Sequence, residues 1–331
     1  MSFPQISPVS LDTLVATTLQ DYEEMSTNVI TSVPAAKAFF EEGVRRTAGG
    51  TKINIPLLYG FNSTTTAYNY SDYIDLSPQE AVTAAQYKFA NVTTAISLFG
   101  EEEAANAGEA VIESLANAKI KQAELSLSRY LNIMLYGDGT GAFGANSDGL
   151  ANLVYPTATP ADPPSGAAGG VSAVTFPFWR NYANTSPGAF ATNDALGTGT
   201  PDYMLRAFNI CSDGSMTPNL ILSDFGTLES YHTNGLSTGH YRVVDNDHLK
   251  GRFRTLDYGG VPWVEDRDCP AQTQYILHTN HIYGVVDMNR FFQPTRWIET
   301  ANQDGKVMRI HLRCGFVCSN RMLQGVLSPW T

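Results

Sequence analysis

The stretch NAGEAVIESLANAKIKQAELSLSRYLNIMLYGDGT, residues 106–140, decides the architecture of this chain. It belongs to a proline-free segment, 101–136, that opens with three glutamates, and a helix N-terminus favours negative charge. Apolar side chains recur along it at helical spacing in one broad stripe: Val111, Ile112, Leu115, Ala118, Ala123, Leu125, Leu127, Tyr130, Leu131 and Met134. Gly137 follows where helices commonly end. The pattern predicts one long helix over 101–136, with Gly108 as a candidate kink.

Such a helix is long relative to the chain that contains it. At 1.5 Å per residue it would extend about 50 Å. A compact globule of 331 residues has a diameter of about 50 Å, so the helix would cross the whole molecule. This favours a flat or elongated subunit built on one spine helix over a round enzyme.

The segment before this helix predicts a long β-hairpin. Residues 51–60, TKINIPLLYG, and residues 86–98 both alternate as strands do, and a polar tip of roughly 25 residues separates them. Ile53, Ile55 and Leu57 share one face of the first strand, and Tyr87, Phe89 and Asn91 share one face of the second. An isolated hairpin is only marginally stable, so this one needs a partner surface. Residues 1–48 show no means of burying themselves and are expected to lie as an arm across another surface.

Composition narrows the class of protein. Hydrophobic residues make up 43% of the chain, which permits a packed core and excludes wholesale disorder. Only 16% are charged, below the roughly 25% typical of soluble proteins, and an under-charged surface favours extensive contact with protein. The formal net charge of −11 argues against a protein whose main task is to grip nucleic acid phosphates.

Cysteine usage and the N-terminus indicate a reducing compartment. Cys211, Cys269, Cys314 and Cys318 are too few for a disulfide scaffold, and the last two share one face of a predicted strand as buried thiols. The N-terminus lacks a signal-peptide pattern, and no apolar run approaches the ~20 residues that cross a bilayer. We therefore expect no membrane partner, and use in a cytoplasm or in a particle assembled there.

No chemical motif predicts a catalytic, cofactor or metal site. Gly139, Gly141 and Gly144 match a dinucleotide fingerprint, but they follow a helix where that motif needs a strand. Ser237 in GLSTG matches a nucleophile elbow without the buried strand that must precede it, so a surface loop is favoured over a hydrolase. The histidines and acidic residues are not spaced along the sequence as zinc or calcium ligands are. We therefore expect the histidines to be structural and the acidic residues to lie on a solvated face. These residues are His232, His240, His248, His278, His281, Asp257, Glu265, Asp266 and Asp268.

An aromatic group follows a Gly/Ala/Pro connector in AAGGVSAVTFPFWRNY, residues 167–182. Phe176, Phe178, Trp179 and Arg180 could form a ligand platform, a core anchor or a surface for another protein. Because no polar or catalytic residues gather around them, we expect anchors of the chain or contacts to a neighbouring subunit. Further on, helices are predicted over 202–211 and 225–232, and strands over 219–224, 261–266 and 306–320.

The order of arm, hairpin, spine helix, α/β domain and returning sheet resembles the major capsid protein of tailed bacteriophages, with the α+β fold called HK-ninety-seven-like. Besides residues 106–140, the segments that carry the resemblance are GGTKINIPLLYG, GGVSAVTFPFWRN, PNLILSD, LDYGGVPWVEDRD and CGFVCSNRMLQGVL. It implies an N-terminal arm (1–48), an extended hairpin loop over a neighbour (49–98), a peripheral domain (99–194, with spine helix 101–136), an axial α/β domain at fivefold and sixfold positions (195–275) and return strands of the peripheral domain (276–331).

The implied function is structural rather than enzymatic. The resemblance implies self-assembly, as pentamers and hexamers, into an icosahedral phage head in the host cytoplasm. The head would enclose double-stranded DNA without sequence-specific binding, with portal, scaffolding and decoration proteins as possible partners. An encapsulin-like shell around enzyme cargo, a serine hydrolase using Ser237 and another virion component such as a tail protein remain alternatives.

Two departures from the family limit what carries over. Some relatives cross-link a hairpin lysine to a neighbour, but no lysine lies between Lys52 and Lys88, so we expect no covalent bond from the tip. Some relatives also begin with a cleaved scaffolding domain of about a hundred residues. The predicted spine helix already starts at 101, after arm and hairpin, so we expect a separate scaffold protein or none.

Overall fold

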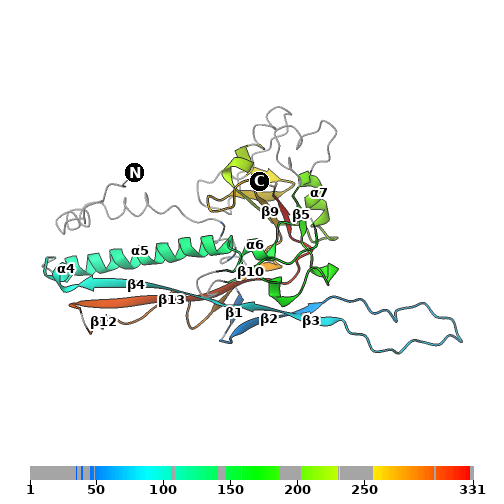
Figure 1. Ribbon diagram of the computed structural model, residues 1–331, viewed down its shortest axis with the longest axis horizontal. Coiled ribbons are helices and arrows are strands. Elements are labelled where there is room, and N and C mark those ends of the chain that lie inside the picture. Colours follow the sequence, from blue (N-terminus) through cyan, green and yellow to red (C-terminus); the bar gives the residue numbers. More distant parts are fainter. Residues whose placement is uncertain are drawn as a thin grey trace.

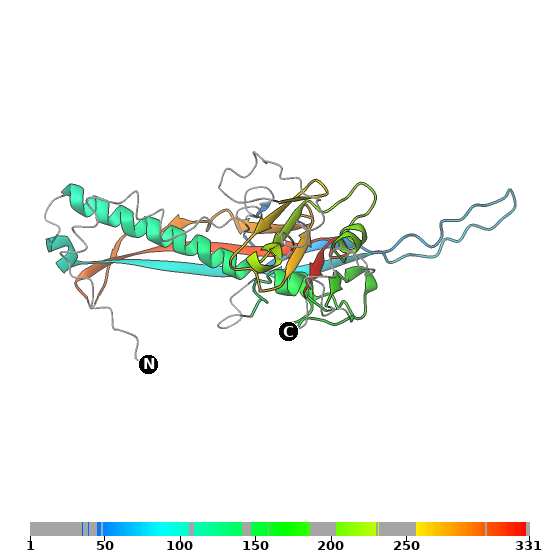
Figure 2. The same cartoon turned by 90° about the horizontal axis from the view of Figure 1, so that it is seen from above.

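The structure is a computed structural model that describes residues 35, 39, 45–47, 49–105, 109–140, 147–157, 159–185, 203–229, 231, 256–301 and 303–328. Within these residues the subunit is elongated, and a long hairpin projects from one end (Figures 1 and 2). Runs of strands and helices are largely segregated along the chain and build two mostly antiparallel sheets, so the predicted α+β class is confirmed. Most of the predicted arm, 1–48, and Ser237 lie outside the described residues.

The first sheet and the spine helix form the long body of the molecule. Strands β4 (Ala90–Phe99) and β13 (Gly305–Cys318) pair antiparallel along ten positions, and α5 (Glu109–Leu135) lies along one face of them (Figure 1). Ile96, Ala123, Leu127, Met308 and Ile310 fill the space between helix and strands. The remaining strands of this sheet are β1 (Arg45–Thr47), β10 (Ile282–Asp287), β11 (Gln293–Pro294) and β12 (Ile298–Glu299).

The helix prediction is confirmed over most of its length. Helix α4 (Gly100–Ala105) precedes α5, which ends two residues before Gly137. Residues 106–108, with the candidate kink at Gly108, lie outside the described residues. Leu115, Leu127 and Leu131 of the predicted stripe are buried, but Tyr130 is 40% exposed. The helix runs along the long axis, as expected for a spine (Figure 2).

The hairpin is present, with one correction. Strands β2 (Lys52–Leu58) and β3 (Val82–Lys88) pair antiparallel, and residues 59–81 extend from them. The predicted continuous strand over 86–98 is wrong, because it breaks at Phe89 between β3 and β4. Phe89 and Ala90 are buried in succession while Asn91 is exposed, so Asn91 does not share a buried face with Tyr87. The break lets the chain leave the hairpin and join β13, as a bulge re-aims a strand.

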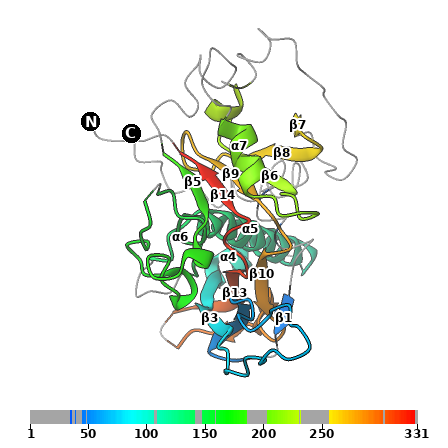
Figure 3. The same cartoon turned by 90° about the vertical axis from the view of Figure 1, so that its right-hand side faces the viewer.

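The second sheet stacks on the first through a shared core (Figure 3). Its order is β5 (Tyr182–Asn184), β14 (Gly325–Leu327), β9 (Gln274–Leu277), β6 (Leu220–Ser223), β8 (Val261–Glu265) and β7 (Leu256–Tyr258). Helix α7 (Tyr203–Ile210) packs on it through Met204 and Ala207, which contact the buried Trp263 cluster. The helix predicted over 202–211 and the strands predicted over 219–224 and 261–266 are confirmed. Because β5 and β14 join this sheet, sheet membership does not follow the expected boundaries at 194 and 275.

Candidate assembly surfaces

The hairpin tip, defined as residues 59–81, has no core of its own. Large apolar side chains on it are exposed to solvent: Phe61, Tyr68, Tyr70, Tyr73, Ile74 and Leu76. Its polar groups bond only to one another, as where Ser63 Oγ donates to Gln79 Oε1 at 2.8 Å and Asn69 N–H donates to Asp72 Oδ2 at 2.7 Å. A two-stranded ribbon with this much exposed apolar surface is a typical site of contact with another protein.

The base of the hairpin, in contrast, is fixed to the body. Ile53, Ile55 and Leu57 are buried on one face of β2, and the Tyr87 hydroxyl donates to the Cys318 carbonyl at 2.7 Å. Gly169, in the short helix η2 (Ala168–Gly170), has φ 63°, and a Cβ built there would lie 2.8 Å from the Ala85 Cβ. Only glycine adopts this backbone at such a close approach without strain. The hairpin therefore leaves the body in a defined direction.

Arg313 ties the root of the hairpin to the first sheet. Its Nη1 lies 2.7 Å from Asp287 Oδ2, and its Nη2 donates to the carbonyl of Gly50. Its guanidinium also lies over the Phe89 ring, 4.4 Å from the centroid, in a cation–π arrangement. One side chain thus connects β13, β10, the Gly50 carbonyl two residues before β2, and the break between β3 and β4.

The four residues singled out from the sequence, three aromatic residues and Arg180, divide into two pairs. Trp179, in the short helix η3 (Pro177–Trp179), is 1% exposed, and its Nε1 donates to the Ala168 carbonyl at 2.9 Å. Arg180 donates to the carbonyls of Ala173 and Val174 at 2.7 and 3.0 Å. These hydrogen bonds close the 167–182 segment on itself, and the burial of Trp179 in the hydrophobic core attaches the segment to its own subunit.

Phe176 and Phe178 face the hairpin root instead. The Phe178 ring stacks on Tyr59, with centroids 5.0 Å apart and planes 14° apart, and Phe176 lies 5.8 Å from Phe178. Phe176 is 40% exposed, so part of this aromatic surface faces solvent where the tip begins. Contact of these residues with a neighbouring subunit stays a prediction.

The structure adds a residue that the sequence reasoning missed, Arg321. This side chain is 1% exposed. It donates to the carbonyls of Leu153 (2.7 Å), Trp179 (3.1 Å) and Asn152 (3.4 Å) and to Asn181 Oδ1 (2.9 Å). Burial lowers the pKa of the guanidinium. Arg321 lies in the segment that leads into β14, and its hydrogen bonds connect this segment to helix α6 (Leu150–Leu153) and to η3.

The C-terminal part of the spine helix contacts the second sheet through a buried polar cluster. Asn132 Nδ2 donates to both carboxylate oxygens of Asp266 at 3.1 Å and to Asp268 Oδ2 at 2.9 Å. Asp266 is 3% exposed, so the predicted solvated acidic face is wrong at this position. Burial raises the pKa of the Asp266 carboxyl, and the nearby Asp268 raises it further, although hydrogen bonds from Asp268 N–H and Asn132 oppose the shift.

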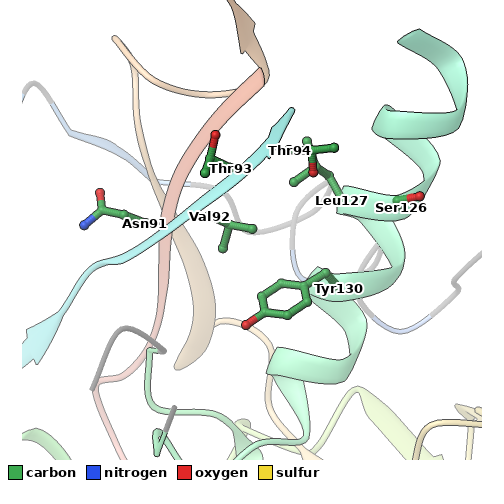
Figure 4. Close-up of a pocket in the computed structure, with 7 residues that line it drawn as sticks. All are labelled: Asn91, Val92, Thr93, Thr94, Ser126, Leu127 and Tyr130. Atoms are coloured by element: carbon green, nitrogen blue, oxygen red, sulfur yellow. The ribbon is translucent and has the colours of Figure 1, made fainter. Parts of the chain in front are cut away.

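A groove of about 490 Å³ lies between β4 and α5 (Figure 4). Its walls are Asn91, Val92, Thr93, Thr94, Ser126, Leu127 and Tyr130. Ser126 Oγ donates to the Gln122 carbonyl at 2.8 Å within its own helix, so it is not positioned as a nucleophile. The lining offers no histidine, acid or cysteine and no arrangement for catalysis.

The other motifs assemble no site within the described residues. His278 and His281 have ring centroids 5.0 Å apart, and burial lowers the pKa of His278. All four cysteines are buried and unpaired, which confirms the prediction of buried thiols for Cys314 and Cys318, and burial raises the pKa of these two to about 12. No group of three potential metal ligands occurs among the residues that were placed, and no helix among them is long and apolar enough to cross a bilayer. Gly141, Gly144, His232, His240 and His248 lie outside this part of the chain.

Solved structures of low sequence identity share this fold. The capsid of cyanophage A-1(L) is 18% identical, with a TM-score of 0.65 over 91% of this chain and 94% of that one. The fold is that of a tailed-phage capsid protein. The capsid of a native GTA particle is similar too, at 11% identity and a TM-score of 0.57 over 92% of this chain and 94% of its own. This HK-ninety-seven-like fold also occurs in the holo-SrpI encapsulin complex of Synechococcus elongatus, at 11% identity and a TM-score of 0.53 over 92% of both chains.

The similarity is visible at the level of structure. No protein-family model and no curated protein matches the sequence.

Proposed function

We propose that this chain is the major capsid protein of a tailed bacteriophage. It assembles through pentamers and hexamers into an icosahedral head that encloses double-stranded DNA. The observation that carries the proposal is a capsid fold whose hairpin tip exposes aromatic side chains and has no core of its own. Such a tip becomes stable by lying on a neighbouring copy, and repeated contacts of this kind can close into a shell.

The charge of the chain is compatible with this role. A formal net charge of −11 weakens adhesion to phosphates, so packaged DNA would be enclosed without sequence-specific binding. Enzymatic activity has no support from the described side chains, which hold no catalytic arrangement. The proposed locations are the host cytoplasm during assembly and the virion afterwards, with portal, scaffolding and decoration proteins as possible partners.

The domain roles follow the same reasoning. The extended loop, 49–98, lies over a neighbour, and residues 195–275 gather around fivefold and sixfold positions. The peripheral domain, 99–194 with the return strands 276–331, meets other copies around threefold positions. The arm, 1–48, lies across another surface.

An encapsulin-like shell is the second candidate, because an encapsulin has the same fold over 92% of both chains. Negative-stain microscopy of the expressed protein tests the shared part of both proposals, and closed shells tens of nanometres across are expected. Nuclease-protected DNA inside purified particles supports the phage head, whereas co-purified enzyme cargo supports the encapsulin. Small oligomers that persist when a scaffold is supplied would contradict both. The hydrolase alternative is tested separately. It is wrong if the Ser237→Ala variant still forms normal shells and the wild-type protein shows no hydrolase activity.

A further inference from the structure

Two carboxyl groups of the second sheet meet one amide of the spine helix. Asp266 directly follows β8, Asp268 lies two residues further on, and Asn132 stands in the last turn of α5. Asn132 Nδ2 lies 3.1 Å from both oxygens of Asp266 and 2.9 Å from Asp268 Oδ2. We call these three residues the carboxyl joint. The amide nitrogen has two protons for three acceptor oxygens, so it cannot satisfy both carboxylates fully.

The backbone holds the two carboxyl groups close together. Asn132 and Asp266 are buried, and Asp268 is half-buried. Asp266 N–H donates to the Ser223 carbonyl at 2.9 Å, and Asp268 N–H donates to Asp266 Oδ1 at 2.9 Å. Because both carboxylates have an oxygen within hydrogen-bond distance of the same nitrogen, these oxygens lie within about 6 Å of each other, a separation at which like charges disfavour ionisation.

No positive charge balances the joint. Within the described residues neither carboxyl group makes an ion pair, and the last turn of α5 contains no basic residue. The C-terminal end of a helix carries a partial negative charge and ordinarily attracts cations. Arg129 and Arg267, the arginines nearest along the chain, are exposed. The other titratable groups around the joint come from its own loop, from the ends of α5, β6 and β8 and from β9, and they are neutral thiol or phenol groups or further acids: Cys269, Tyr136, Tyr275, Asp224 and Glu265.

Proton binding relieves this imbalance. A proton on one carboxyl group removes a negative charge beside the helix end and adds an O–H donor. Burial, and to a smaller degree the Asp268 charge, raise the pKa of Asp266, so the folded state binds this proton more tightly than the unfolded state does. The resulting stabilisation is full below the unfolded pKa of about 4 and is lost as pH rises through the folded pKa.

The joint lies where the spine helix meets the second sheet. Helix α5 packs along the first sheet through Ala123 and Leu127, whereas the two carboxyl groups belong to the second sheet. The adjacent residues Leu131, Leu135 and Val264 belong to the apolar core that the two sheets share. Burial of apolar surface involves no titrating group. The joint therefore adds a pH-dependent contact to an interface whose apolar part is insensitive to pH.

We propose that the carboxyl joint is a proton-controlled clamp between the spine helix and the second sheet. With one carboxyl group protonated, the joint holds the arrangement described above. With both groups ionised, the Asn132 amide satisfies only one carboxylate, the two charges repel each other, and the second sheet turns more freely against the helix. The clamp is a property of the single subunit and does not depend on the proposed shell function. In a shell it would make the angle between helix and second sheet respond to pH.

Hydrogen exchange of the full-length chain tests the clamp between about pH 4.5 and pH 8, above the ordinary carboxyl pKa of about 4. Backbone exchange is followed in peptides covering residues 128–136 and 261–270. Each rate is divided by the rate of the same unfolded peptide at that pH, because intrinsic exchange also depends on pH. The corrected rate should rise about tenfold with pH, the change that corresponds to one pKa unit. Residues 92–98 of β4, away from the joint, should change less than about twofold.

Two substitutions and a control assign the effect to the joint. Asp266→Asn removes the titrating carboxyl group but keeps an amide oxygen as acceptor, and it should reduce the rise to less than about twofold. Asp268→Asn, at a half-buried position, removes the repelling charge and should reduce the rise to about threefold. Glu124→Gln removes an exposed carboxyl group from the same helix and should behave like the wild type.

Two results would overturn the clamp: a corrected wild-type rate that stays flat over this pH range, or an Asp266→Asn variant that shows the same rise as the wild type. If Asp266→Asn does not fold, the wild-type series and Asp268→Asn decide, and a rise that Asp268→Asn leaves unchanged also refutes the proposal. Exchange is measurable on unassembled subunits. A protein that forms no shells therefore contradicts the proposed function and leaves this test intact.

Discussion

Replacing the buried Arg321 with methionine should destabilise the subunit strongly. The substitution keeps a long apolar stem and removes all hydrogen bonds to Leu153, Trp179, Asn152 and Asn181. A hydrogen bond to a charged group contributes about 1.5–3 kcal/mol, and a buried carbonyl left without a donor costs about 1–3 kcal/mol. These terms are not additive, and methionine avoids the cost of burying a charge. We expect a net loss of about 3–5 kcal/mol in the free energy of unfolding.

The assay is denaturant unfolding of dissociated subunits, followed by tryptophan fluorescence. Trp179 is a suitable reporter because its indole is buried and its carbonyl accepts from Arg321. The expected change is a lower midpoint denaturant concentration with an unchanged slope, which indicates lost stability rather than a changed unfolded state.

Two control variants separate the loss of the hydrogen bonds from the loss of an arginine as such. Arg321→Lys keeps the charge but cannot reach acceptors spread around a planar guanidinium, so an intermediate loss is expected. Arg129→Met removes an exposed arginine from α5 and should change stability by less than about 0.5 kcal/mol. If Arg321→Met unfolds within about 1 kcal/mol of the wild type, the inference that Arg321 fastens these segments is wrong.

Three further substitutions test other parts of the structure. Trp179→Ala should cost about 3–5 kcal/mol and abolish particles visible by microscopy; normal shells would dismiss Trp179 as an anchor. Gly169→Ala should cost about 2–4 kcal/mol, measured by thermal unfolding, because φ is 63° and Ala85 is only 2.8 Å from the new Cβ. The raised pKa of Asp266 means that the folded state holds this proton more tightly than the unfolded state does. Its contribution to stability is full below the unfolded pKa of about 4 and declines as pH rises through the folded pKa. Asp266→Asn should remove that decline from a pH series of unfolding midpoints, whereas Asp138→Asn, which removes a carboxyl whose pKa is lowered by Thr140, should not.

The sequence predicts those elements whose periodicity is local and unbroken. Strand β2 alternates strictly between exposed and buried positions, and α5 buries Leu115, Leu127 and Leu131 at helical spacing. The break at Phe89 escaped prediction, because Phe89 and Ala90 look like part of one alternating run. Two consecutive buried residues were needed where the chain passes from β3 to β4, and only the pairing partners of each strand reveal this.

The polar contacts of the core could not be found in the same way. Arg321 stands in the polar sequence SNRML, and its acceptors are up to 169 residues away along the chain. Asp266 lies in the charged run EDRD, which is typical of a solvated loop, while the amide that binds it lies 134 residues earlier. A buried charge depends on partners that meet only after folding, so local pattern assigns such residues to the surface.

The fixed hairpin base also bears on assembly. The tip, residues 59–81, extends about 35 Å at 3.3 Å per residue, so a rotation of about 10° at the base would move its end about 6 Å. That displacement is larger than the reach of an ion pair or a hydrogen bond. A head-to-tail contact closes into a shell only if each copy presents its tip in the same direction. In the proposed shell, the contacts of Gly169, Tyr87 and Arg313 at the base would therefore set the geometry of association as well as stability. A substitution at Gly169 should accordingly reduce the yield of closed shells even at temperatures where the subunit stays folded.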